Sequence, residues 1–104
     1  MLKVMYLDDV HYPAMGTSLQ GRVDISYKEL VEVFGQPNAG DGYKTEAEWI
    51  IMTRYGAATI YDYKEGKTYN GKDGLNKTEI TDWHIGGSNQ ETVKEVLRAL
   101  GREV

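Results

Sequence analysis

The segment TDWHIGGSNQETVKEVL, residues 81–97, carries the residue types best suited to binding an anion. His84 is a proton donor that titrates near neutral pH, and Gly86 and Gly87 let a ligand approach the backbone closely. A helix is expected to begin directly after them, and the unpaired N–H groups of a helix start carry partial positive charge. These features predict a phosphate cradle, although the glycine pair also fits a simple turn from strand to helix. The predicted site takes in Trp83, His84, Gly86, Gly87 and Ser88.

Aromatic and basic side chains elsewhere in the chain could complete such a site. The eight tyrosines exceed what the core of a 104-residue domain requires, so some of them must reach the surface. In AATIYDYK, residues 57–64, Tyr61 and Tyr63 alternate with Ile60, so both tyrosines are exposed if Ile60 points inward. If a helix covers their face instead, they belong to the core. The available cations are Arg22, Lys44, Arg54, Lys64 and Lys67, of which Arg22 and Lys64 are assigned to the site.

Residues suited to catalysis or to metal binding are few. The chain has two histidines and no cysteine, so a nucleophile would be a serine or threonine with His11 or His84 as its base. Ser88 follows His84 by four residues, but a role as a helix cap explains it better. Asp8, Asp9 and His11 form a compact cluster of metal-ligand types that nothing else completes. We therefore expect a protein that is not an enzyme and has no catalytic residue, metal or cofactor.

Length, charge and cysteine content limit the class of protein. A chain of 104 residues is expected to form one domain, and the absence of cysteine fits a reducing compartment. Sixteen acidic against twelve basic residues give a net charge of −4, the wrong sign for a general nucleic-acid binder. The first residues, MLKVMYLDDVHYPAMG, contain only a short apolar run, so neither a signal peptide nor a membrane span is expected. We expect a cytoplasmic protein that binds neither DNA nor membranes directly.

Two amphipathic helices are predicted by the same start signal. In ISYKELVEVFG, Ser26 and Glu29 form a capping box before apolar residues at helical spacing. In GSNQETVKEVLRALG, Ser88 and Glu91 repeat the pattern, and a glycine ends each segment. The predicted helices span residues 26–35 and 89–100.

Runs of β-branched and aromatic residues predict the sheet that these helices cover. Residues 46–55 and 57–64 flank Gly56 and are typical of a hairpin. Trp49 and Phe34 lie on apolar stripes, so both are expected in the core. The other expected strands are residues 2–7, 18–25 and 80–85, and the expected loops are residues 36–45 and 65–79. The prediction is a single compact α+β domain with an antiparallel sheet and two amphipathic helices.

Five short segments occur in an order that resembles a widespread group of small bacteriophage-encoded proteins. They are GTSLQG at 16–21, LVEVFGQP at 30–37, KTEAEW at 44–49, ATIYDYK at 58–64 and WHIGG at 83–87. The resemblance covers most of the chain, and its most specific parts are IYDYK and WHIGG. That group is largely uncharacterised, so the resemblance implies a phage origin and assigns no catalytic residue.

A phage origin implies a small binding protein that acts in the host cytoplasm during infection. One interpretation is a non-enzymatic counter-defence protein that sequesters a phosphate-containing ligand such as a nucleotide second messenger; the glycine pair, His84 and the surplus tyrosines favour it. The alternative is a direct inhibitor of a host defence effector or other host enzyme, such as a nuclease or CRISPR effector, which the mild acidity favours. Because so small a domain has little interior volume, a nucleotide pocket is more easily built between subunits, and we expect a homo-oligomer.

Overall fold

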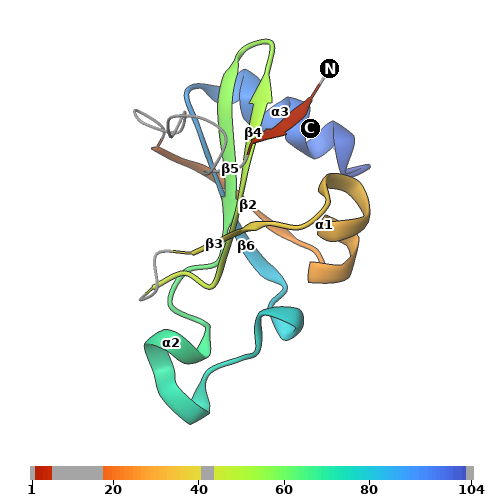
Figure 1. Ribbon diagram of the computed structural model, residues 1–104. Helices are drawn as coiled ribbons and strands as arrows, with labels where there is room; N and C mark the ends of the chain where they lie inside the picture. The colour runs from red at the N-terminus through yellow and green to blue at the C-terminus, as the bar shows by residue number, and fades with distance from the viewer. Residues whose placement is uncertain (1, 6–17, 41–43, 103–104) are drawn as a thin grey trace.

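The computed structural model of the protein describes residues 2–5, 18–40 and 44–102. Six strands form one antiparallel sheet, in the order β1, β4, β5, β6, β2, with β3 pairing with the first residues of β4 (Figure 1). The strands are β1 (Lys3–Met5), β2 (Ser18–Asp24), β3 (Asn38–Ala39), β4 (Ala47–Thr53), β5 (Gly56–Tyr61) and β6 (Asp82–Gly87). The predicted hairpin is confirmed, because Thr53 of β4 pairs with Gly56 of β5. Of the strand expected at 2–7, residues 6 and 7 lie outside the described residues.

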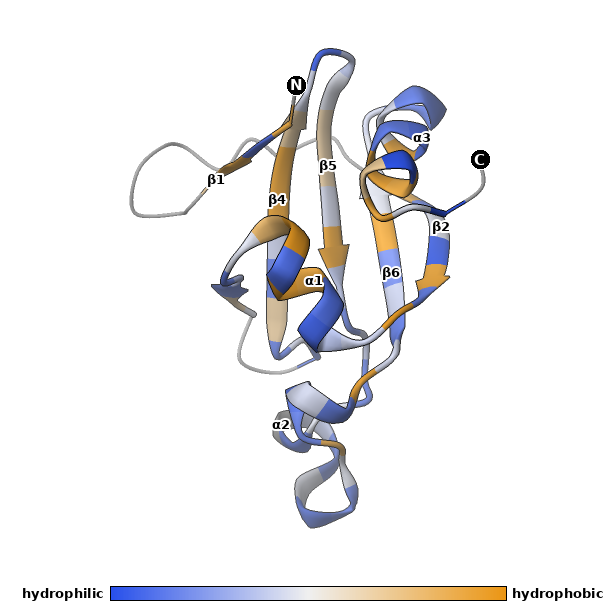
Figure 2. Ribbon diagram, turned by 90° about the vertical axis from the view of Figure 1, so that its right-hand side faces the viewer, coloured by the Kyte–Doolittle hydropathy of each residue, from blue (hydrophilic) through white to orange (hydrophobic). Residues whose placement is uncertain are grey.

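Two amphipathic helices, α1 (Tyr27–Phe34) and α3 (Gln90–Ala99), lie on the same face of the sheet (Figure 2). The predicted cap of α1 is confirmed, since the Ser26 hydroxyl accepts a hydrogen bond from the Glu29 N–H at 3.1 Å. The α+β class is therefore confirmed as well. No helix in the described part of the chain is long and apolar enough to cross a membrane.

The start of α3 differs from the prediction. Its cap is Asn89 and not Ser88. The side-chain oxygen of Asn89 accepts a hydrogen bond from the Thr92 N–H at 3.1 Å. The Ser88 N–H instead donates to the Ala57 carbonyl of β5 at 3.1 Å, so residue 88 still continues the pairing of β6 with β5. The capping signal was therefore assigned one residue too early.

An aromatic cluster forms the centre of the core between the sheet and the helices. Trp49 and Trp83 meet edge to face with ring centroids 5.3 Å apart, and Tyr27 of α1 packs 5.7 Å from Trp49. Both tryptophans are fully buried, and Phe34 is buried as well. The prediction that Trp49 and Phe34 belong to the core is therefore confirmed. The indole N–H of Trp49 donates to the Gly35 carbonyl at 2.8 Å, so the cluster also fixes the end of α1.

The segment predicted as a loop at 65–79 is a folded lobe below the sheet (Figure 1). It contains α2 (Lys67–Asn70) and the 3₁₀ helices η1 (Gly71–Asp73) and η2 (Lys77–Glu79). The Leu75 N–H donates to the Glu65 carbonyl at 2.8 Å and closes the base of the lobe. The side-chain amide of Asn70 donates to the Lys64 carbonyl at 2.8 Å. Polar composition was a poor guide here because backbone and amide hydrogen bonds, not apolar burial, hold this segment.

Candidate functional site

The face of the sheet turned away from α1 and α3, called here the open face, carries a row of polar and aromatic side chains. Arg22 of β2 pairs with His84 of β6, His84 with Tyr61 of β5, and Tyr61 with Glu48 of β4. Residues directly opposite each other in neighbouring strands share one face of a sheet, so these four form a line across it. Sheet pairing thus brings together residues that are far apart in the sequence.

Three rings make an aromatic cluster on this face. The imidazole of His84 stacks on Tyr61 with centroids 5.5 Å apart and an interplanar angle of 18°. The ring of Tyr63 meets His84 at 5.7 Å and 66°. Ile60 is fully buried in the core, whereas Tyr63 keeps 40% of its surface exposed. Of the two orientations left open from the sequence, the structure therefore has the tyrosines turned away from the core.

His84 has a buried nitrogen atom without a partner. Among the described residues, Nδ1 of His84 is the one buried side-chain polar atom that makes no hydrogen bond. Burial lowers the pKa of His84, and the neighbouring Arg22 lowers it further. The imidazole is therefore neutral at neutral pH. A buried polar atom without a hydrogen bond costs about 1–3 kcal/mol, so a ligand that reaches Nδ1 would recover that energy.

Charged groups at the β2 end of the row are coupled. The Arg22 guanidinium donates to both carboxylate oxygens of Asp82, from Nε at 3.1 Å and from Nη2. This hydrogen-bonded pair lowers the pKa of Asp82. Glu65 lies against the same carboxylate, and its pKa is raised by burial and by the charge of Asp82. Arg22 is thus already paired with Asp82, and Glu65 and Asp82 bring two carboxyl groups together at this end of the row.

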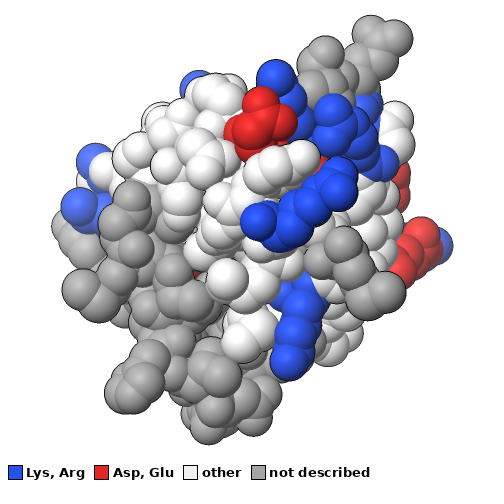
Figure 3. All heavy atoms as spheres, turned by 90° about the horizontal axis from the view of Figure 1, so that it is seen from above, with Lys and Arg blue, Asp and Glu red and all other residues white. Residues whose placement is uncertain are grey.

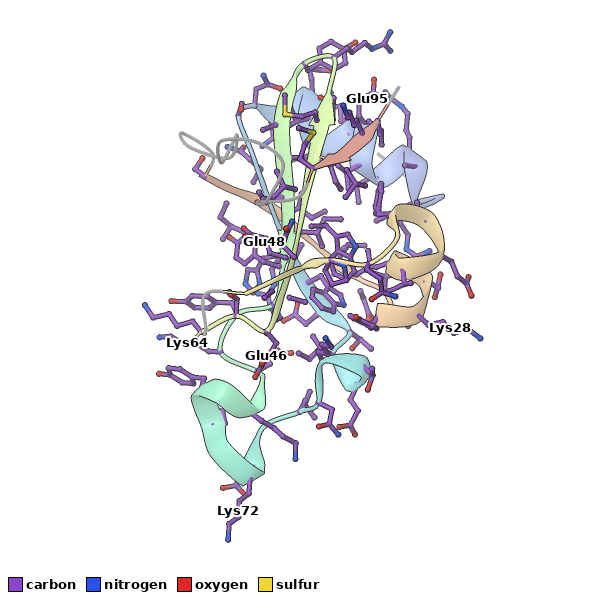
Figure 4. The ribbon with its side chains drawn as sticks, viewed as in Figure 1. Lys28, Glu46, Glu48, Lys64, Lys72 and Glu95 are labelled. Atoms are coloured by element: carbon purple, nitrogen blue, oxygen red, sulfur yellow. The ribbon has the colours of Figure 1, made fainter. Side chains whose placement is uncertain are left out.

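A lysine–tyrosine column, made of Lys44, Tyr63, Lys64 and Tyr69, borders the aromatic cluster. The Lys64 ammonium lies 5.2 Å from the ring centroid of Tyr63 and 5.4 Å from that of Tyr69, and the Lys44 ammonium lies 5.9 Å from Tyr63. Such distances allow cation–π attraction. Figure 4 shows Lys64 on the opposite side of the sheet from Lys28 of α1.

The backbone of Lys64 is held in an unusual conformation. Its φ of 61° makes it the one non-glycine residue with positive φ among the described residues. Its N–H donates to the Lys44 carbonyl at 2.8 Å, which ties the two lysines of the column together. A left-handed non-glycine residue stores strain, and such residues cluster at functional sites.

Five of the residues assigned to the site from the sequence come together here: Arg22, Tyr61, Tyr63, Lys64 and His84. Trp83 does not, because it points into the core and its indole N–H donates to the Ile80 carbonyl at 3.2 Å. The alternation of side chains along β6 separates Trp83 from its neighbour His84.

Gly86 and Gly87 do not form the predicted cradle. Strand β6 was expected to end at residue 85, but it continues to Gly87, and both glycines pair with β2 on one side and β5 on the other. With the Ser88 N–H also bonded, the predicted donors belong to the sheet, so the cradle geometry is wrong. The glycines instead permit close packing. A Cβ on Gly87 would overlap Thr92 of α3, and one on Gly86 would lie 2.7 Å from the Thr59 hydroxyl.

Asp62 is a key residue that the sequence did not single out. Its fully buried carboxylate accepts hydrogen bonds from the N–H of Glu46 at 2.8 Å and from that of Ala47 at 3.0 Å. Burial raises the pKa of Asp62, and the two backbone donors oppose that shift. Asp62 thereby anchors the start of β4 beside the lysine–tyrosine column. The sequence feature that could have identified Asp62 is its spacing of two residues from Ile60, which puts both side chains on the same strand face.

The opposite end of the molecule, at the β4–β5 turn, carries a second group of charges. Figure 3 views this end, where basic side chains outnumber acidic ones. Arg54 pairs with Glu95 of α3 at 3.1 Å and lies 5.1 Å over the ring of Tyr55, which is 41% exposed. This end therefore presents an exposed aromatic ring beside a paired cation.

No protein-family model matches the chain, and no curated protein matches it. The resemblance to small phage proteins therefore stays a prediction.

Within the described residues no group of three histidine, aspartate or glutamate side chains is placed to hold a metal ion. Asp8, Asp9 and His11 lie outside the described residues.

Proposed function

We propose that the protein binds a phosphate-containing ligand with a planar ring, such as a nucleotide, on its open face. The observation that carries this proposal is the lysine–tyrosine column standing against the Tyr61–His84 stack, whose Nδ1 atom lacks a partner. Aromatic rings and lysines in alternation offer a stacking surface and point charges for phosphate.

Each part of a nucleotide has a counterpart in the cluster. The exposed ring of Tyr63 stacks against the base, and the ammonium groups of Lys44 and Lys64 attract the phosphate. The Glu65–Asp82 pair accepts hydrogen bonds from hydroxyl or amino groups. The contacts of all three parts come from side chains, in place of the backbone cradle expected from the sequence.

The biological role we propose is sequestration without turnover, as a counter-defence protein of phage type acting in the host cytoplasm. Its support is the resemblance of the IYDYK and WHIGG segments and the binding chemistry of the open face. Because Tyr63 is exposed, one chain leaves a bound ligand open to water. A second copy would cover it, so we also propose a homo-oligomer.

Calorimetric titration with cyclic dinucleotides, cyclic trinucleotides and ADP-ribose tests the binding. Lys64→Asn removes the charge while keeping a residue type that tolerates positive φ. It should weaken binding roughly 10- to 150-fold, the equivalent of one charge-assisted hydrogen bond. Lys28→Gln, on the opposite side of the molecule, is the matched control and should bind like the wild type (Figure 4). No heat with any of these ligands would exclude them, and equal losses in both variants would show non-specific attraction.

The second candidate is direct inhibition of a host defence effector or another host enzyme, such as a nuclease or CRISPR effector. The observation that favours it is the set of exposed apolar side chains outside the open-face cluster, including Leu19 at 56%, Val33 at 46% and Tyr55 at 41%. Native mass spectrometry of the protein purified from infected cells separates the two. A retained nucleotide supports sequestration, whereas a stoichiometric protein partner lost on Tyr55→Ser supports inhibition.

A further inference from the structure

A cavity of about 490 Å³ lies between the 65–79 lobe and the start of β4. It is lined by Glu46, Lys67, Leu75, Asn76, Lys77 and Thr78. None of the residues of the lysine–tyrosine column lines it, so it is separate from the site on the open face. Cavities of roughly 300–1,000 Å³ are the usual size for small-molecule sites.

The walls of this cavity are built in advance of any ligand. The Asn76 N–H donates to the Glu79 carboxylate at 2.9 Å, and the Glu79 N–H returns a bond to the Asn76 carbonyl at 2.8 Å. The side chain of Glu46 packs so closely on Gly66 that a Cβ at that glycine would overlap it. Glycine at 66 therefore gives Glu46 the room to line the cavity.

The charges of the lining select the chemistry of an occupant. Lys67 and Lys77 come from the two arms of the lobe, and neither forms an ion pair with a described residue. The Lys77 ammonium is placed 5.9 Å from the ring of Tyr27, at the side of the lobe that faces α1. Against these two cations stands the single carboxylate of Glu46. The excess of positive charge favours an anion.

We propose that this cavity is a second binding site, for a small organic anion that also carries a hydroxyl or amino group. The anionic group lies between Lys67 and Lys77, the donor group faces the Glu46 carboxylate, and the carbon skeleton contacts Leu75. Asn76 and Thr78 add polar groups that orient it. The site stands independently of ligand binding on the open face.

An NMR titration of the full chain with O-phosphoserine tests the proposal, since that probe combines a phosphate with an amino group. We expect chemical-shift changes concentrated at residue 46 and at residues 66–78. Inorganic phosphate, which lacks the amino group, should bind at least about tenfold more weakly. Absence of shifts, or shifts spread over lysines elsewhere, would overturn the site.

Two lysine variants from the same lobe make the test specific. Lys67→Gln should weaken O-phosphoserine binding roughly tenfold or more, because it removes one of the two lining cations. Lys72→Gln is the matched control, since Lys72 lies in η1 and points away from the lobe into solvent (Figure 4). Both are exposed, so neither should change the melting temperature. Equal loss in the two variants would contradict the proposal, and nucleotide binding by Lys67→Gln at wild-type affinity would show that the two sites are separate.

Discussion

The two faces of the sheet each carry a cluster of three aromatic rings, and the clusters share neighbouring residues of one strand. Trp83 joins Trp49 and Tyr27 on the helix side, whereas His84 joins Tyr61 and Tyr63 on the open face. The ring centroids are 5.3–6.3 Å apart in the first cluster and 5.5–5.7 Å apart in the second. Geometry alone therefore does not distinguish a core cluster from a binding surface.

Hydrogen bonding and charge do distinguish them. On the helix side both indole N–H groups donate to backbone carbonyls, of Gly35 and Ile80. On the open face the buried Nδ1 of His84 has no partner, and lysine ammonium groups stand against Tyr63. Satisfied polar atoms indicate that the first cluster stabilises the fold. An unsatisfied buried atom beside lysine ammonium groups indicates that the second cluster is kept for a ligand.

Replacing one ring from each cluster should give the largest contrast. Trp83→Ala removes a fully buried ring and should lower the free energy of unfolding by about 3–5 kcal/mol. His84→Ala should change it far less, because the ring is only partly buried and its Nδ1 makes no hydrogen bond. Urea denaturation of both variants measures the difference. Similar losses would mean that the open-face cluster is structural.

Substitution of Asp62, which anchors the start of β4, should have the next largest effect on stability. In the wild type the Asp62 carboxylate accepts hydrogen bonds from the N–H groups of Glu46 and Ala47. Asp62→Asn keeps the shape of the side chain but places an NH₂ donor against one of these N–H donors. We expect a loss of about 1–3 kcal/mol in the free energy of unfolding. Asp73→Asn, exposed on η1, is the control and should stay within about 0.5 kcal/mol of the wild type. An unchanged Asp62→Asn would show that these backbone bonds contribute little.

Substitution of Gly87 distinguishes the close packing seen in the structure from the phosphate cradle expected from the sequence. Gly87→Ala places a Cβ against the Thr92 hydroxyl, which is fixed by its 2.7 Å bond to the Asn89 carbonyl, and should cost about 1–3 kcal/mol. Gly21→Ala is the control, because its Cβ would lie at an ordinary 3.7 Å from Val93. Thermal unfolding compares the two. A stable Gly87→Ala that binds phosphate more weakly would restore the cradle.

Local patterns predicted the parts of the fold that depend on local chemistry. The Ser26 cap and the Gly56 hairpin follow from a hydrogen bond and a turn within a few residues. The inward side of Ile60 was one of two orientations that the alternation left open. The end of β6 did not follow, because a glycine pair is typical of a turn and is disfavoured inside a strand. What decided it was pairing with β2 and β5 and the approach of Thr92, all distant in sequence.

The candidate site was predictable in residue types but not in arrangement. His84, Arg22 and the two tyrosines stood out by their chemistry, and strand pairing placed His84, Arg22 and Tyr61 in one row. Glu65 was missed because its role depends on contact with Asp82. The folded lobe was missed because side-chain amides, including that of Asn70, replace an apolar core there.

The smallest expected effect is a dependence of stability on pH that only the open-face cluster should show. Burial lowers the pKa of His84 below its ordinary value of 6.5, so the folded state favours the neutral ring. The stabilisation is complete above pH 6.5 and is lost as the pH falls through the lower pKa of the folded state. Glu65, whose pKa is raised, acts in the opposite direction, since its contribution is lost as the pH rises.

Comparison of the wild type with His84→Asn at each pH cancels the contribution of Glu65 and of the other groups whose pKa does not depend on His84. The difference in free energy of unfolding between the two proteins should therefore shift against the wild type between about pH 7.5 and about pH 5.5, because only the wild type must bury a charged imidazole in acid. A bound phosphate should reverse the sign, since an anion favours the protonated ring, and the wild type would then gain stability in acid relative to the variant. A difference that stays constant with pH, with and without a nucleotide, would show that His84 neither loses contact with water on folding nor meets the phosphate.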